Sequence, residues 1–270
     1  MIIFNFIKIM HLFISTEQKK SQGLQVWIPR LNLLAEDNQA IEEGKWLSDR
    51  VINAAQELLK SISTSIGGLQ NALLAQNLQF TIERDRFVQI LHVSGNHWIT
   101  IANNGCTGGE IKVYDSMGHS DLPEETKQQV AALIFTSVNK ITLTFQTVQR
   151  QQDSSSCGLF AVAFATSLCF GSDPSTIMYD SATLRSHLKH CFVSGIMEPF
   201  PGKEIKARRP YSHVQYDVFC SCRLTRGKEK MARCDNCLEW FHKSCKKIPG
   251  CVFSKSQISK WFCHSCNSST

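Results

Sequence analysis

The sequence predicts an α+β protein, and three features of its pattern lead to that class. Apolar residues recur at helical spacing over 45–62, short alternating runs occupy 87–93, 97–102 and 110–115, and the segment 157–170 is apolar on nearly every side. With 270 residues, 43% of them hydrophobic, the chain can bury a sizeable core and hold one large domain plus something smaller.

The individual elements follow from apolar spacing and from the residues that interrupt it. The helix at 45–62 rests on the positions Trp46, Leu47, Val51, Ile52, Ala55, Leu58 and Leu59, and a pair of glycines follows it. After the three strands we expect a helix at 124–135 and a strand at 141–149. The segment 157–170 should be the central buried helix. A last helix, 181–191, precedes the turn sequence PFPG, where we place the end of the domain.

The loop NNGCTGG joins two of the predicted strands into a β-hairpin. If the hairpin is centred on Cys106, His97 faces Asp115, and apolar pairs follow on the same side, Ile99 with Val113 and Ile101 with Ile111. The buried face therefore ends in an imidazole and a carboxylate within cross-strand reach. Taken singly, either residue also fits a hydrogen-bonded polar group at the end of a sheet.

Cys157 stands where a polar loop meets the predicted central helix. The unpaired backbone N–H groups and the dipole at a helix N-terminus favour a thiolate over a thiol. With His97 as base and Asp115 fixing the imidazole tautomer, Cys157 becomes the nucleophile of a triad. Gln151 could direct its amide at a developing oxyanion, beside the backbone N–H of Cys157. Without those neighbours, Cys157 equally fits a buried structural thiol.

The 12 cysteines would suggest disulfides if the chain were secreted, so the cellular compartment has to be inferred before their chemistry. The stretch MIIFNFIKIMHLFI lacks a preceding basic region, is interrupted by Lys8 and His11, and has no small-residue cleavage site. It is also too short to span a bilayer. We therefore expect a buried strand or an extension of uncertain status over 1–30, no membrane association, and thiols that are reduced or metal-bound in the nucleus or the cytoplasm.

Charge divides the chain near Pro201. Residues 201–270 hold 14 Lys and Arg against 5 Asp and Glu, a net charge of +9, whereas residues 1–200 hold 15 against 18. The basic part favours an acidic partner or nucleic-acid surroundings. For 203–209 alone, a solvated basic linker explains the charge equally well. We expect 201–217 to be a tether with little apolar content that docks on neither side.

The C-terminal segment contains four close pairs of cysteine and histidine: Cys220 with Cys222, Cys234 with Cys237, His242 with Cys245, and Cys263 with Cys266. Eight such ligands are enough for two closed tetrahedral zinc sites. About fifty residues cannot otherwise bury a core, so bound Zn²⁺ must supply the folding free energy.

Most of the chain, 45–200, resembles the ubiquitin-like-protein-specific cysteine proteases, the family of the SUMO proteases and the adenovirus protease, in the versions found in transposon-derived genes. The resemblance is carried by His97-Trp98, Tyr114-Asp115, Gln151, Cys157-Gly158 and the sequence WLSDRVI at 46–52.

This resemblance implies an adenain-like, papain-like cysteine protease domain over 31–200 that needs no catalytic cofactor. It implies the triad His97, Asp115 and Cys157, with Gln151 in the oxyanion hole and a tunnel for a Gly-Gly tail between Trp46 and Trp98. Two indoles in close approach would exclude residues with side chains. Ser156 is a departure, because the family usually has aspartate before the nucleophile. We expect Ser156 to cap the helix and to weaken activity without abolishing it.

The segment 218–268 resembles a plant homeodomain (PHD) finger in its ligand order, in Trp261 two residues before a cysteine, and in the EWFH sequence. The family's interleaved order implies one zinc on Cys220, Cys222, His242 and Cys245 and a second on Cys234, Cys237, Cys263 and Cys266. Spacing alone does not establish that interleaving. Fingers that read methylated histone tails carry a cage at positions matching Phe219, Met231 and Trp240, and Asp235 could pair with a basic residue of the tail. Alternatively, these aromatic residues only cover the zinc core.

Three functions remain open at this point. The first is a thiol isopeptidase that acts on a ubiquitin-like modifier or its conjugates and is tethered to chromatin by a methyl-lysine histone tail, in the nucleus. The second is a catalytically weak or inactive chromatin-binding protein derived from a transposon protease, which Ser156 keeps possible. The third is an acyltransferase with a related core, which Asp115 and the two tryptophans disfavour.

Overall fold

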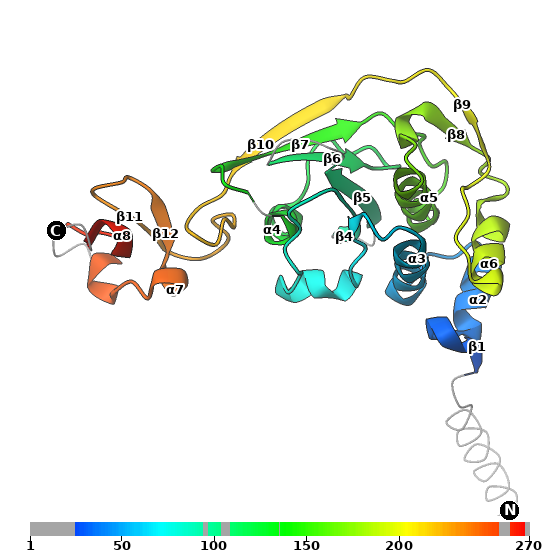
Figure 1. Cartoon of the computed structure of the whole chain (residues 1–270), viewed down its shortest axis with the longest axis horizontal. Coiled ribbons are helices and arrows are strands. Elements are labelled where there is room, and N and C mark those ends of the chain that lie inside the picture. Colours follow the sequence, from blue (N-terminus) through cyan, green and yellow to red (C-terminus); the bar gives the residue numbers. More distant parts are fainter. Residues whose placement is uncertain (1–24, 94–96, 104–108, 135, 254–259, 268–270) are drawn as a thin grey trace, which may run out of the picture.

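The computed structural model describes residues 25–93, 97–103, 109–134, 136–253 and 260–267, so the expectations for 1–24 and for the centre of the hairpin loop lie outside the described residues. Its main feature is a six-stranded sheet (Figure 1). From one edge to the other its strands are β10 (Ser212–Asp217), β7 (Lys140–Gln146), β6 (Glu110–Tyr114), β5 (His97–Asn103), β4 (Phe87–Val93) and β3 (Gly67–Gly68). The pairs β6–β7 and β3–β4 are parallel, and the other pairs are antiparallel.

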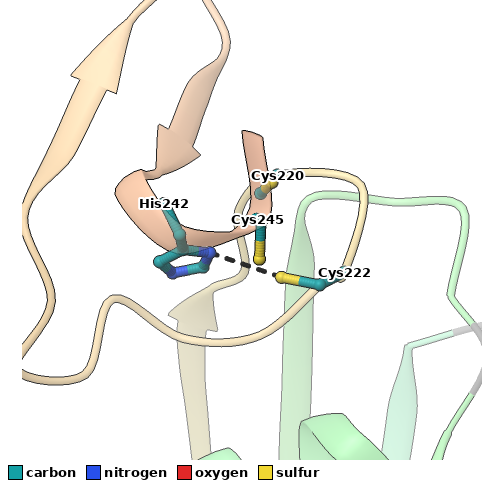
Figure 2. Close-up of side chains that lie close together, drawn as sticks. All are labelled: Cys220, Cys222, His242 and Cys245. Atoms are coloured by element: carbon teal, nitrogen blue, oxygen red, sulfur yellow. Dashed lines mark hydrogen bonds between the residues drawn. The ribbon is translucent and has the colours of Figure 1, made fainter. Parts of the chain in front are cut away.

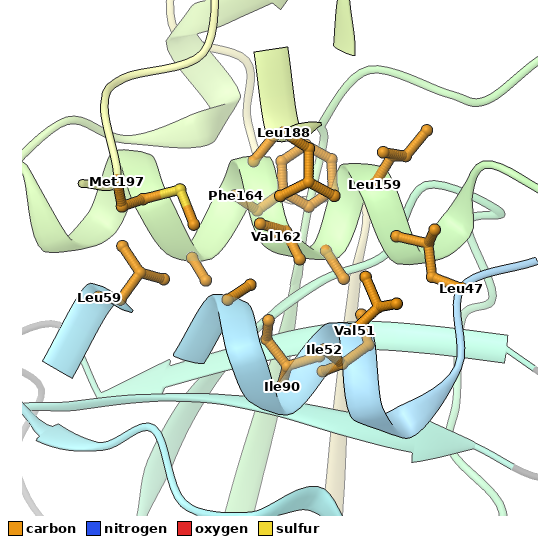
Figure 3. Packing of buried hydrophobic residues seen from close by; sticks show 14 of the residues in the cluster. Leu47, Val51, Ile52, Leu59, Ile90, Leu159, Val162, Phe164, Leu188 and Met197 are labelled. Atoms are coloured by element: carbon orange, nitrogen blue, oxygen red, sulfur yellow. The ribbon is translucent and has the colours of Figure 1, made fainter. Parts of the chain in front are cut away.

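One face of the sheet is covered by helices that share a single apolar core (Figure 3). At its centre lies α5 (Cys157–Cys169), which is buried from Cys157 through Leu168, as its apolar sequence predicts. Around it pack α3 (Asp49–Ile62) and α6 (Leu184–Ser194), and α2 (Ala35–Glu42) lies against α6. The hydroxyl of Thr100 on β5 donates to the carbonyl of Ala161 at 2.7 Å, which fixes α5 against the sheet.

The other face is covered by α4 (Glu124–Leu133), whose Val130 and Leu133 join a second apolar core with the strand residues Ile99, Ile101 and Val113. The sheet is therefore buried on both faces near its centre. None of the described helices combines the length and the apolar character needed to cross a membrane.

Short elements connect these layers. They are β1 (Val26–Ile28), η1 (Pro29–Leu31), β2 (Leu33–Leu34), η2 (Ala72–Asn77), η3 (Pro174–Thr176), β8 (Ile177–Tyr179) and β9 (Gly202–Glu204). The sequence pattern missed α2 because, of its eight residues, only Asp37 and Ile41 are buried. That burial leaves too weak an apolar stripe to identify a helix.

The expectation that 201–217 docks on neither side is wrong for two parts of it. The strand β9 pairs with β8, and β10 pairs with β7 along its whole length as an edge strand of the main sheet. Val214 and Tyr216 pack against the second core, and Val218, which follows, is completely buried in it. Alternation of only two apolar residues in a basic segment was too sparse a signal to predict a strand.

Beyond β10 the chain forms a small C-terminal unit, the finger, which is orange to red in Figure 1. Its elements are β11 (Met231–Arg233), β12 (Trp240–His242), α7 (Lys243–Lys246), η4 (Gly250–Phe253) and α8 (His264–Asn267). Among the residues that the structure describes here, the buried apolar cluster consists of three cysteines together with Ala232, Phe241 and Ile248. Such a core is too small to stabilise the unit without cross-links or metal.

Candidate active site and metal centres

Cys157 is the first residue of α5 and lies at the bottom of a cavity, only 2% exposed. The helix can approach the loop before α3 closely because Gly158 follows the cysteine. A Cβ atom at Gly158 would lie 3.1 Å from Cβ of Leu47, tighter than ordinary contact. Packing therefore explains the glycine, since any side chain at this position would push α5 away from Leu47.

His97 begins β5 and Asp115 directly follows β6, so both side chains lie at the same end of the sheet. Nε2 of His97 is 2.6 Å from Oδ1 of Asp115, and both residues are buried. Since Nε2 faces the carboxylate, Nδ1 remains to make the hydrogen bond between His97 and Cys157. The structure thus brings together the three residues of the predicted triad.

The predicted hairpin register is wrong by two residues. Ile101 lies opposite Val113 instead of Ile111, and Thr100 lies opposite Tyr114. A shift of two residues leaves every side chain on the same face of the sheet, so the apolar pattern cannot distinguish the two registers. His97 and Asp115 still meet because Asp115 lies beyond the end of β6, where its side chain is not fixed by cross-strand pairing.

His97 and Asp115 each stabilise the charged form of the other. Burial lowers the pKa of His97, but the hydrogen bond that His97 donates to Asp115, followed by the one it shares with Cys157, outweighs burial and raises the pKa to about 9. Burial raises the pKa of the Asp115 carboxyl, and the hydrogen bond and positive charge of His97 outweigh it, so that this pKa falls well below its ordinary value. His97 is therefore positively charged at neutral pH, with the Asp115 carboxylate on one side and the sulfur of Cys157 on the other.

The sequence analysis did not identify His119, which is a further hydrogen-bond partner of the Asp115 carboxylate. Oδ2 of Asp115 accepts from the backbone N–H of His119 at 2.9 Å and from its Nδ1 at 2.8 Å, while Met117 N–H donates to Oδ1 at 2.8 Å. The three side chains His97, Asp115 and His119 have ligand atoms within 4.8 Å of one another, and these hydrogen bonds account for their closeness. A histidine four residues after Asp115 in an irregular loop gives no periodic signal.

Gln151 lies beside the loop that holds Asp115. Its side-chain oxygen accepts from Ser116 Oγ at 2.7 Å, and its Nε2 donates to the Asp153 carbonyl at 2.7 Å. An amide nitrogen has two N–H donors, and the contact with Asp153 uses one of them. The orientation is fixed because the Ser116 hydroxyl must donate to the amide oxygen in this arrangement.

The expectation that Ser156 caps the helix with its side chain is wrong. Ser156 occupies the position before α5 but its side chain makes no capping hydrogen bond. Its hydroxyl instead donates to Oδ2 of Asp153 at 2.7 Å. The hydroxyl is held by a charged acceptor three residues upstream, and in this orientation its oxygen accepts no hydrogen bond from the N–H groups of α5.

Two cavities meet at Trp46. One, of about 480 Å³, is lined by the predicted triad His97, Asp115 and Cys157 together with Trp46. The other, of about 380 Å³, is lined by Trp46 and Trp98. The indole N–H of Trp46 donates to the Ser154 carbonyl at 2.5 Å, and that of Trp98 donates to the Leu47 carbonyl at 3.1 Å. Trp46, which is 49% exposed, lines both cavities, whereas Trp98, only 6% exposed, lines one of them.

In the finger, the eight predicted cysteine and histidine ligands gather into two groups. In each group the ligand atoms lie within 4.8 Å of one another, and the groups are Cys220, Cys222, His242 and Cys245 (Figure 2), and Cys234, Cys237, Cys263 and Cys266. This partition is the interleaved one that the resemblance implied. Sets of four thiolates, or three thiolates and an imidazole, suit a tetrahedral soft-ligand site.

The surroundings of these ligands also fit a metal. Nε2 of His242 lies 2.9 Å from the Thr225 carbonyl, which can only accept, so the ring proton is on Nε2 and Nδ1 has its lone pair toward Cys222 at 3.3 Å (Figure 2). In the second group, the backbone N–H of Cys263 donates to Sγ of Cys234 at 3.3 Å. Both contacts orient ligand atoms toward the centre of their group.

Three of the four predicted histone-binding residues, Phe219, Met231 and Trp240, line one cavity of about 300 Å³. Asp217, the last residue of β10, and Arg226 complete its lining. Asp235 is not among the lining residues, and its carboxylate accepts from the backbone N–H of Trp261 at 2.7 Å. The acidic group at this cavity therefore comes from the strand that belongs to the main sheet.

No protein-family model matches the chain, and no curated protein matches it. Among solved structures, it is similar to the SUMO protease Ulp1 with the catalytic cysteine oxidized to a sulfinic acid, at 12% identity and a TM-score of 0.50, covering 66% of this chain and 91% of that one. The same protease with the cysteine oxidized to a sulfonic acid gives 13% identity and a TM-score of 0.50, covering 68% and 95%. The large domain therefore has the mixed α+β fold of a Ulp1-type protease domain.

Proposed function

We propose that residues 31–200 form a thiol isopeptidase, of the transposon-associated type, that cleaves after the Gly-Gly tail of a ubiquitin-like modifier, SUMO-like in kind. One observation supports this above all others. His97 lies between a buried carboxylate at 2.6 Å and a buried cysteine at a helix N-terminus, on a fold shared with a SUMO protease.

In the proposed reaction, the Cys157 thiolate attacks the carbonyl carbon of the last glycine, and the carbonyl oxygen becomes an oxyanion. The remaining N–H of the Gln151 amide donates to that oxyanion. As the tetrahedral intermediate collapses, Nδ1 of His97 gives its proton to the departing lysine amine, and a thioester remains. His97, now neutral, takes a proton from water, which attacks the thioester and releases the free carboxylate and the thiolate.

The tail is proposed to reach Cys157 by passing Trp46 and Trp98. Both indoles line the second cavity, and only Trp46 lines the cavity that contains Cys157. A passage between two rings selects residues without a side chain, which explains a preference for two glycines.

The finger is proposed to be a PHD finger with two structural Zn²⁺ ions that supply its folding free energy. Its cavity of about 300 Å³, lined by Phe219, Met231 and Trp240, has the aromatic and sulfur character that attracts a methylammonium group. The ligand proposed here is a methyl-lysine histone tail, which would hold the protease at chromatin in the nucleus.

The second candidate is a catalytically weak or inactive chromatin-binding protein. Ser156 favours it, because this residue replaces the aspartate expected before the nucleophile and does not cap α5.

A panel of ubiquitin-like proteins with an electrophile in place of the last glycine distinguishes the two candidates. The protease should form a covalent adduct with at least one SUMO-like member, and Cys157→Ala should form none. Cys169→Ala, which removes a half-buried thiol at the far end of the same helix, serves as the control and should still form the adduct. If the unaltered chain forms no adduct with any member, the inactive alternative holds.

A further inference from the structure

The loop before the nucleophile is organised around one carboxylate that the proposed mechanism does not use. Oδ1 of Asp153 accepts from the backbone N–H of Ser155 at 2.8 Å and from that of Ser156 at 2.7 Å. Oδ2 accepts from the Ser156 hydroxyl at 2.7 Å. Three donors from the two residues directly before Cys157 therefore converge on a single side chain.

The carboxylate is held in its charged form by those donors. Burial raises the pKa of Asp153, and the hydrogen bonds from Ser156 and Ser155, together with the positive charge of Arg185, lower it to below its ordinary value. Charge-assisted hydrogen bonds of this kind are stronger than neutral ones. The turn from 153 to 156 is thus fixed by a group that stays ionised at neutral pH.

The same turn is tied to the segment before α3. The hydroxyl of Ser155 donates to the Gly44 carbonyl at 2.7 Å, and Arg185 of α6 donates to the Lys45 carbonyl at 3.0 Å. The Ser154 carbonyl accepts from the Trp46 indole. Displacement of this turn would therefore move both the start of α5 and the wall of the catalytic cavity.

We propose that Asp153 is the positioning residue for Cys157, supplying from within the loop the carboxylate that the sequence lacks at position 156. This inference rests on the proposed function of the site. Since Asp153 fixes the two peptide units that precede Cys157, it sets the first turn of α5 and with it the direction of the Cys157 sulfur toward His97. A misplacement of about 1 Å in a catalytic group can lower the rate about a hundredfold.

The test compares full-length variants with a fluorogenic SUMO-like substrate. Asp153→Ala should lower kcat between about tenfold and a hundredfold, because the direction of the Cys157 sulfur toward His97 is no longer fixed. The double variant Asp153→Ala with Ser156→Asp moves the carboxylate to position 156. It should recover at least a third of the loss in log kcat. A loop residue that only stabilised the fold would not be rescued by a carboxylate at 156.

The matched control is Asp173→Ala. The Asp173 carboxylate likewise accepts a hydrogen bond from the backbone N–H two residues later, that of Ser175 at 2.9 Å, but in a different loop. It should leave kcat unchanged. Retention of more than half the kcat by Asp153→Ala, or a double variant no better than the single one, would overturn the proposal.

A second readout needs no protein substrate and separates this proposal from the proposed function. The rate at which iodoacetamide alkylates Cys157, followed by mass spectrometry of its peptide, should fall at least fivefold in Asp153→Ala and recover in the double variant. If the unaltered chain cleaves no modifier but this pattern appears, Asp153 positions the thiol and the proposed substrate is wrong. An unchanged alkylation rate in Asp153→Ala counts against the positioning role whatever the substrate.

Discussion

The hydroxyl of Tyr211 donates to the backbone carbonyl of His119 across 2.7 Å. The next residue, Ser212, donates in the same way to the carbonyl of Ser120 at 2.9 Å. The guanidinium of Arg150 lies 5.4 Å from the centre of the Tyr211 ring and donates to the Met117 carbonyl. Tyr211, which directly precedes β10, and Ser212, its first residue, thus hydrogen-bond to the loop that follows Asp115.

The first prediction tests this contact. Tyr211→Phe removes one hydrogen bond and keeps the ring, so we expect kcat to fall about threefold to tenfold with little change in KM. Tyr216→Phe is the control: this tyrosine lies within β10, and its hydroxyl donates at 3.0 Å to the Lys127 carbonyl of α4 instead of to the loop after Asp115. Equal losses in both variants would show that only the strand's stability matters.

The second prediction concerns pH. His97 has its pKa raised to about 9, so its charge and the stabilisation from its ion pair are fully present below its ordinary value near 6.5 and are lost as pH rises through about 9. The plot of kcat/KM against pH should therefore fall on its alkaline side near pH 9. Asp115→Asn removes the main source of the shift, so this limb should move to lower pH, whereas His213→Gln, on the exposed edge of β10, should leave it in place. A limb that does not move in Asp115→Asn would contradict the assignment.

The third prediction concerns the oxyanion. Gln151→Ala should lower kcat about a hundredfold, the usual effect of removing one such donor. Gln151→Glu keeps an acceptor for Ser116 but places negative charge beside the oxyanion, so it should be at least as impaired. Gln152→Ala changes the exposed neighbour and should retain full activity. Comparable activity in the two alanine variants would remove Gln151 from the mechanism.

Apolar periodicity was enough to predict the main strands and the buried helix. The ranges 87–93 and 124–135 agree with β4 and α4 to within two residues, and α5 begins at Cys157 as expected. These elements lie in the core, where the side-chain pattern is imposed by burial on one or both faces.

What the sequence could not supply are contacts between irregular segments. His119 and Asp153 act through hydrogen bonds to backbone and side-chain atoms in loops, where residue spacing has no period to reveal a shared face. The edge strand β10 was missed for a different reason: Val214 and Tyr216 are its only large apolar residues, and the basic segment before them suggested a tether.

The fourth prediction concerns metal. The chain should bind two Zn²⁺ ions, and Cys222→Ser should reduce this to about one, because a three-ligand structural site is incomplete. Cys251→Ser is the matched control, since this exposed cysteine belongs to neither group of ligands, and it should retain both ions. Elemental analysis of the purified variants measures the outcome. Loss of zinc from Cys251→Ser, or its full retention in Cys222→Ser, would require a different ligand set.

The last prediction separates binding from catalysis. Trp240 is 44% exposed and lines the cavity of the finger, so Trp240→Ala should abolish binding to a methyl-lysine histone peptide. Phe262→Ala removes an aromatic side chain of similar exposure, 41%, that does not line this cavity, and should bind normally. Turnover of a small soluble substrate should be unchanged in both variants, because the connection to the catalytic loop runs through β10 and Val218 and not through Trp240. Peptide titration and a fluorogenic assay on the same preparations measure the two effects. Unaltered affinity in Trp240→Ala would remove the aromatic cage, and a large loss of turnover would show that the cavity itself is coupled to the active site.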